Sequence, residues 1–132
     1  MTVLLVDVAN VVGSRPDGWW RDRAGATTRV LGRLAGLAGR EVPGPDGGTL
    51  RLSDLVAVVV GQGRAAPTPV GVTVVRADGS GDDALAALAA SRAGEDLLVV
   101  TADRGLRARL PRGTAVTGPG WLLALLDDVA PA

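Results

Sequence analysis

The 132-residue sequence contains no cysteine, no histidine and no lysine. Without cysteine there can be no disulfide, no thiolate nucleophile and no cysteine metal site. Without histidine there can be no histidine-dependent triad and no imidazole-ligated zinc. The absence of lysine excludes the P-loop, Schiff-base and receiver-domain mechanisms, each of which needs an ammonium group. Any metal must therefore be held by oxygen ligands, which favours Mg²⁺ or Mn²⁺.

The overall composition is that of an ordinary globular domain. Hydrophobic residues make up 47% and charged residues 21%, and the formal net charge is zero. We expect one domain over residues 1–132 with a core of its own. No apolar run is long enough to span a bilayer, and no basic region precedes the first apolar run, so we expect neither a signal peptide nor a membrane contact and predict a cytoplasmic protein. Nucleic-acid binding would need a local cluster of arginines, since no global charge attracts polyanions.

The first strand and the turn that ends it organise the rest of the chain. Residues 3–6 are all apolar, which is typical of a strand buried on both faces inside a parallel sheet. Asp7 follows directly, and Asn10 comes three residues later. Ligands of open α/β sheets bind beyond the carboxyl ends of the strands, so Asp7 would lie where chemistry takes place. The alternative is that Asp7 only caps the turn.

Strands and helices alternate along the remaining chain. We predict helices over residues 26–38, 84–92, 104–110 and 119–126, strands over residues 55–60, 70–75, 96–101 and 114–117, and a loop at residues 43–48. This order predicts a three-layer α/β/α fold in which helices cover a mostly parallel sheet of about four to five strands. Asp54 lies before its strand, at the wrong edge for the site, and we interpret it as structural.

Acidic residues follow or face three of the predicted strand ends. Asp82 and Asp83 open a helix, where the macrodipole favours negative charge, and Asp103 follows the strand at 96–101. Each position alone is compatible with a helix cap. Parallel strands would bring all of them together with Asp7 at one edge, where crowded carboxylates repel one another unless a cation neutralises them. The residues therefore predict a Mg²⁺ or Mn²⁺ site that acts on a phosphoryl substrate.

The segment after Asn10 combines tryptophan with arginine. Indole faces stack on bases, and guanidinium groups hold phosphates. The candidate substrate-binding residues are Ser14, Arg15, Trp19, Trp20, Arg21, Arg23 and, farther along the chain, Arg104. The alternative is that the two tryptophans begin a helix and that one ring packs into the core.

Three short motifs, in this order, resemble those of the PIN-like nucleases, in particular their NYN-domain branch. Residues 4–10 resemble the opening strand, in which an aspartate is followed three positions later by an asparagine. Residues 81–89 resemble the acidic helix start, and residues 99–106 resemble the later strand, which ends in threonine or serine, any residue, and aspartate. Each motif is short, and the ordered set is more specific than any one of them.

The resemblance implies a set of roles and has two departures. It implies a PIN/NYN-like fold in which the catalytic metal ligands are Asp7, Asp82, Asp83 and Asp103, with Asn10 orienting the site or the scissile phosphate and Thr101 supporting it. The 5′-nucleases related to DNA polymerases carry a glutamate where this chain has Ser80, and a further aspartate where it has Gly105. The expected site therefore has fewer carboxylates than theirs.

The function that these observations predict is that of a metal-dependent nuclease acting on RNA. One alternative is a pyrophosphohydrolase of free nucleoside triphosphates, which the same carboxylates could support. A compact closed pocket would favour that enzyme, and an open groove would favour the nuclease. Another alternative is a non-catalytic PIN-like module that binds RNA or protein. A homodimer or a protein partner is compatible with all three functions.

Overall fold

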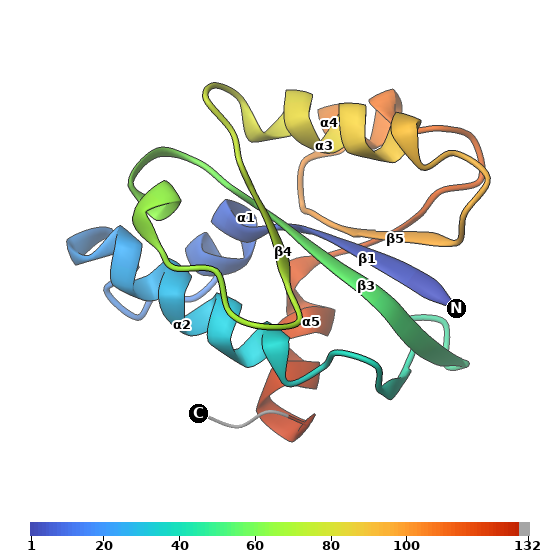
Figure 1. Ribbon diagram of the computed structural model, residues 1–132, viewed down its shortest axis with the longest axis horizontal. Coiled ribbons are helices and arrows are strands. Elements are labelled where there is room, and N and C mark those ends of the chain that lie inside the picture. Colours follow the sequence, from blue (N-terminus) through green and yellow to red (C-terminus); the bar gives the residue numbers. More distant parts are fainter. Residues whose placement is uncertain (130–132) are drawn as a thin grey trace.

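The computed structural model describes residues 1–129, which form a six-stranded sheet with helices on both faces (Figure 1). The strands are β1 (Thr2–Asp7), β2 (Glu41–Pro43), β3 (Thr49–Val59), β4 (Thr73–Arg76), β5 (Leu97–Val100) and β6 (Ala115–Thr117). The α-helices are α1 (Val8–Gly13), α2 (Arg23–Ala35), α3 (Gly81–Ser91), α4 (Arg104–Arg109) and α5 (Pro119–Val129), and two 3₁₀ helices are η1 (Trp19–Arg21) and η2 (Gly61–Ala65). None of the helices within these residues is long and apolar enough to cross a membrane.

Strand β1 lies at the centre of the sheet because both of its faces are apolar. It pairs in parallel with β3 on one side and with β5 on the other, and all six of its residues are buried. Its side chains alternate between two cores, as the period of a strand requires. Leu4 and Val6 pack with α1, α2 and α5, whereas Val3 and Leu5 pack with α3 and α4. The result is the three-layer arrangement seen in Figure 1.

The parallel strands bring several helix starts to one edge of the sheet. Strands β1, β3, β4, β5 and β6 all run in the same direction, so that their carboxyl ends lie together. Helix α1 follows β1 directly, α3 follows β4, and α4 follows β5. This edge therefore carries the turns in which the predicted acidic residues occur. The expected α/β fold with a mostly parallel sheet is confirmed.

Several predicted boundaries are wrong. The loop at 43–48 is the turn of an antiparallel hairpin between β2 and β3, which makes the sheet larger than the four to five strands expected. Strand β3 extends through Asp54, and β4 begins at Thr73 rather than at 70. Helix α2 runs from 23 to 35 instead of 26 to 38, because the carboxylate of Asp22 accepts a hydrogen bond from the backbone N–H of Gly25 and so caps an earlier start.

Candidate catalytic site

Asp7 ends β1 with its carboxylate turned inward. It occupies the N-cap position of α1 without a side-chain cap hydrogen bond, although the backbone N–H of Asn10 in the first turn of this helix lies close enough to lower its pKa. Its side chain is 6% exposed, and the hydroxyl of Thr101 donates a hydrogen bond to its Oδ2 over 3.0 Å. Burial raises the pKa of Asp7 above its ordinary value, while the Thr101 hydroxyl and the backbone N–H of Asn10 oppose the rise.

Thr101 connects Asp7 with Asp103. Its side chain is fully buried directly after β5, and its Oγ1 accepts a hydrogen bond of 3.1 Å from the backbone N–H of Asp103. Since that N–H is the donor, the hydroxyl proton is left for Asp7. Two of the predicted acidic residues are thus connected to each other through one threonine.

Asp103 and Asp82 interact electrostatically, and each shifts the pKa of the other. Asp103 caps α4, where its Oδ1 accepts a hydrogen bond of 3.0 Å from the Leu106 N–H, and this bond lowers its pKa together with the contact to Asp82. The interaction with the Asp103 carboxylate raises the pKa of Asp82, and burial and the negative charges of Asp103 and Asp7 add to the rise. Three carboxyl groups from three separate elements therefore interact at this edge of the sheet.

The N-terminus of α3 places Asp82 and Asp83 differently from the cap predicted for them. Ser80 is the N-cap, and its Oγ accepts a hydrogen bond of 3.1 Å from the Asp82 N–H. Asp83 is 72% exposed and forms an ion pair of 2.8 Å with Arg109 at the end of α4. Arg109 also lowers the pKa of Asp82 and of Asp103, so its charge acts on both of these carboxylates as well. No local sequence signal marks Arg109, because the packing of α3 against α4 places it there.

Asn10 fixes the turn that carries Asp103. Its Oδ1 accepts a hydrogen bond of 2.9 Å from the backbone N–H of Ala102, which ties α1 to the segment after β5. The side chain of Ser14 is engaged differently, because its hydroxyl donates to the Val11 carbonyl over 2.8 Å. Asn10 therefore belongs to the acidic site, whereas Ser14 closes the end of α1.

The sequence left open whether the two tryptophans of η1 stack on a base or pack into the core, and the structure places the two rings differently. Trp19 packs against the core and carries the guanidinium of Arg23 over its ring, 5.1 Å from the centroid. Trp20 is 51% exposed, and Arg21 lies 6.0 Å from its ring centroid. One ring is therefore structural, and the other is available to stack on a base.

The remaining arginines predicted to bind phosphate differ in their surroundings. Arg15 pairs with Asp127 of α5 at 2.7 Å, which turns it toward the α2 side of α1. Arg104 is exposed at the first position of α4, directly after Asp103. Among the arginines predicted to bind phosphate, Arg104 is thus the one that directly follows a predicted acidic site residue, Asp103, in the sequence.

The predicted metal ligands Asp7, Asp82, Asp83 and Asp103 do not form a complete coordination site for a metal ion in this structure. Among residues 1–129, no three acidic side chains already stand close enough together to hold one ion. Asp82 and Asp103 shift each other's pKa, the charge of Asp7 raises the pKa of Asp82, and the charge of Asp103 raises that of Asp7. A pair of carboxylates completed by water is a usual protein environment for Mg²⁺, which keeps several of its waters. The donor set therefore fits a hard divalent ion.

The mostly parallel sheet and its five α-helices are consistent with a PIN/NYN-like α/β fold. Among solved structures, the chain is similar to the crystal structure of a mutant of Rae1 (YacP) from Bacillus subtilis, with a TM-score of 0.71 and 18% sequence identity over 98% of this chain and 77% of that one. No family model matches the sequence, and no curated protein matches it either. At this level of identity, the likeness establishes the fold.

Proposed function

We propose that the protein is a metal-dependent nuclease that hydrolyses phosphodiester bonds in RNA. The observation that carries the proposal is the meeting of Asp7, Asp82 and Asp103, which come from three elements separated in sequence, at the carboxyl edge of a parallel sheet. The fold shared with Rae1 and the ordered motifs of the PIN-like nucleases add support.

The residues that would hold the cation are Asp82 and Asp103, with Asp7 as the third acidic group. A bound Mg²⁺ or Mn²⁺ supplies an activated water and stabilises charge on the phosphoryl oxygens. Asp83 stays a predicted ligand whose pair with Arg109 would have to open first.

The chain itself supplies positioning and charge around this site. Thr101 and Asn10 hold Asp7 and the turn of Asp103 in fixed relation. Arg109 pairs with Asp83, and the exposed Arg104 directly follows Asp103 in the chain, so both can contact a substrate phosphate. Because Asp82 keeps a proton to a higher pH than an ordinary aspartate, we expect activity to rise as pH rises through its elevated pKa, when the carboxylate becomes free to bind the cation.

The exposure of the site favours a polymer over a free nucleotide. Asp83 and Arg109 are 72% and 47% exposed at its rim. Three pockets of about 430, 550 and 230 Å³ are lined by residues other than Asp7, Asp82 and Asp103. An open acidic edge admits a continuous strand, whereas a triphosphate hydrolase would enclose its substrate. RNA is the substrate proposed by the resemblance to the NYN branch.

The test is a substrate panel with one protein preparation. Labelled single-stranded RNA, duplex DNA and nucleoside triphosphates are incubated with the protein in Mn²⁺, in Mg²⁺ and in EDTA, beside an Asp7→Asn preparation purified in parallel. We expect cleavage of RNA in the presence of metal only and none by the variant. Hydrolysis of triphosphates without RNA cleavage would replace the nuclease with the pyrophosphohydrolase, and binding of RNA without any hydrolysis would favour the non-catalytic module.

A further inference from the structure

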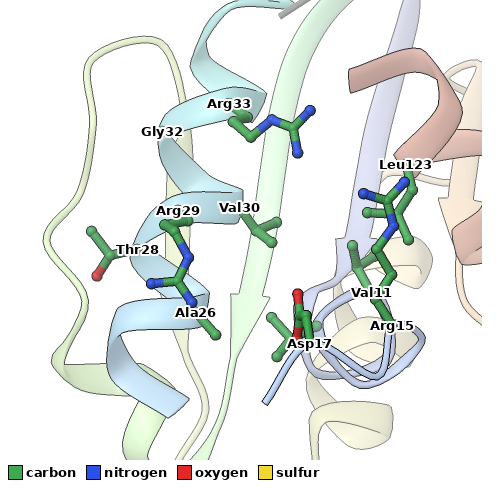
Figure 2. A pocket seen from close by; sticks show the side chains of 11 residues that line it. Val11, Arg15, Asp17, Ala26, Thr28, Arg29, Val30, Gly32, Arg33 and Leu123 are labelled. Carbon is green, nitrogen blue, oxygen red and sulfur yellow. The ribbon is translucent and has the colours of Figure 1, made fainter. Parts of the chain in front are cut away.

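A second concave surface lies on the α2 side of α1, away from the acidic edge. It is a pocket of about 430 Å³ between α1, α2 and α5, which we call the arginine pocket (Figure 2). Its volume lies in the range of about 300–1,000 Å³ that is usual for sites binding small molecules. Figure 2 shows Val30 and Arg33 on α2 extending toward the side that carries Arg15 and Asp17.

The floor of the arginine pocket is apolar and belongs to the core. Val11, Val12, Ala26 and Leu123 line it, and each of them is less than a tenth exposed. These side chains come from three helices whose packing fixes the shape of the floor. A planar apolar group, such as a nucleobase, would cover this floor without displacing a hydrogen-bonded side chain.

The rim of the arginine pocket carries an excess of positive charge. Arg15 and Arg33 both pair with Asp127, at 2.7 and 2.8 Å, and this fixes their guanidinium groups at the pocket. Within residues 1–129, Arg29 has no comparable hydrogen bond or ion pair, although it lines the same pocket. The lining of this pocket, as far as the structure describes it, contains three arginines and one aspartate. An anionic ligand therefore fits this rim.

We propose that the arginine pocket binds one nucleotide of single-stranded RNA, with the base against the apolar floor and a phosphate on Arg29. The proposal rests on the proposed nuclease function, because the pocket is joined to the acidic edge by α1. Asp7 stands at the start of α1, and Val11 and Val12 on the same helix line the pocket. At about 1.5 Å of rise per residue, this separation is roughly 6–8 Å along the helix axis. The proposal therefore requires that one RNA strand crosses α1 to reach both places.

RNA fits the arginine pocket better than an acidic peptide does. Aspartate and glutamate side chains would satisfy the arginines but would leave the apolar floor uncovered. A nucleotide supplies both a flat apolar face and a charged phosphate, and Asp17 can accept a hydrogen bond from a base amino group or a ribose hydroxyl. Arginine also suits phosphate through its planar set of donors.

The experiment measures RNA binding without cleavage. Fluorescence anisotropy of a labelled single-stranded RNA is recorded in EDTA for the parent, for Arg29→Gln and for the matched control Arg112→Gln, over a range of salt concentrations. Arg112 lies before β6, at the opposite end of the sheet. We expect Arg29→Gln to weaken binding about tenfold or more and to reduce the salt slope by about one, as the loss of one phosphate contact would do. The control should bind like the parent.

The outcomes separate this proposal from the nuclease function. If Arg29→Gln binds like the parent, if both variants weaken binding equally, or if the parent binds no RNA, the pocket assignment is overturned. If a labelled poly-glutamate peptide binds with the affinity of RNA and displaces it, the occupant is an acidic protein segment instead. Arg29-dependent binding by a protein that cleaves nothing in Mn²⁺ would support the pocket and reject the nuclease.

A second variant tests the arginine pocket by filling it with a larger apolar side chain, without changing any charged residue. Val30 is half-buried and extends into the pocket, so Val30→Phe should occupy the space of the base. We expect RNA binding to weaken by about tenfold, comparable to the loss of one base-stacking contact, while the thermal unfolding transition stays cooperative. Parent-like RNA affinity in this folded variant would contradict the placement of the base.

Discussion

The hydroxyl of Thr101 lies 3.0 Å from Oδ2 of Asp7, and both side chains are buried. The Oγ1 of Thr101 also accepts a hydrogen bond from the backbone N–H of Asp103 over 3.1 Å. One threonine therefore orients a buried carboxylate and also the turn that carries a second carboxylate. A hydrogen bond to a carboxylate favours its charged form and therefore limits the pKa rise that burial causes at Asp7. Thr101 thus favours the ionised form of Asp7, in opposition to the burial that favours the neutral acid.

Replacing Thr101 tests this role directly. Thr101→Val keeps the shape but removes the hydroxyl, which leaves Asp7 without its donor and the Asp103 N–H without its acceptor. We expect nuclease activity to fall by about 10–100-fold, as is usual for partners that orient a metal-binding group, and the pH profile to move to higher pH. Thr101→Ser restores the hydroxyl and should recover most of the activity. Equal activity in the valine and serine variants would show that the hydroxyl has no such role.

Asp7 should make the protein less stable at neutral pH when no metal is present. Its pKa is raised in the folded state, so the folded protein binds more protons than the unfolded chain at pH values between the unfolded pKa and the folded one. The free energy of unfolding therefore falls as pH rises through that window. We expect Asp7→Asn to melt higher than the parent at pH 7.5 in EDTA, with the difference shrinking as pH approaches the ordinary pKa of aspartate.

A matched control separates this effect from a general loss of negative charge. Asp54→Asn removes an exposed carboxylate that pairs with Arg92 at 3.2 Å, far from the acidic edge, and should not raise the melting temperature. Should Asp7→Asn melt lower than the parent at pH 7.5, the hydrogen bond from Thr101 would outweigh the cost of burying the charge.

Asp83 and Arg109 should act as a pair. Because both are exposed, the pair should contribute less than about 1 kcal/mol to the free energy of unfolding. We expect Asp83→Asn and Arg109→Gln each to lower activity, and the double variant to be no worse than Arg109→Gln alone. The measurement is the rate against Mn²⁺ concentration for all four proteins. If Asp83→Asn still raises the Mn²⁺ needed for half-maximal rate in the Arg109→Gln background, Asp83 contacts the ion itself.

Gly105 offers a gain-of-function test. Its φ is not positive, and a Cβ built at this position would lie 3.2 Å from Oδ1 of Asp103, so a side chain there faces the acidic group. We expect Gly105→Asp to lower the Mg²⁺ concentration needed for half-maximal activity, since it adds an oxygen ligand. Gly105→Ala controls for crowding and for the change in helix propensity. The same Mg²⁺ midpoint in both variants would mean that a carboxylate at 105 does not reach the ion.

The sequence predicted those parts of the site that depend only on which residue follows each apolar strand. Asp7 follows an apolar strand and Asp103 follows another, and parallel pairing with β1 brings their turns together. The alternation of strands and helices was enough for the fold class. The short strand β2 was missed because its three residues, which end in Pro43, are too few to show the alternation of apolar and polar side chains that is typical of a strand. Its hairpin with β3 also depends on pairing across a turn.

Contacts between distant helices could not be predicted in this way. Asp83 meets Arg109 only because α3 and α4 lie side by side on one face of the sheet. Arg15 meets Asp127 over 112 positions of sequence, so a residue expected to hold phosphate is instead fixed at a different pocket. Such ion pairs depend on the packing angle and offset of two helices, which hydrophobic patterns leave open.

The central claim is that the acidic edge catalyses metal-dependent cleavage, and the most direct measurement compares three proteins purified in parallel. These are the parent, Asp103→Asn, and Asp54→Asn as the control for loss of one carboxylate elsewhere. The initial rate of cleavage of a labelled single-stranded RNA is measured in Mn²⁺ and in EDTA. We predict that Asp103→Asn loses more than about 100-fold in rate, beyond the usual effect of an indirect partner, while Asp54→Asn cleaves like the parent. Equal cleavage by Asp103→Asn and the parent would contradict the account.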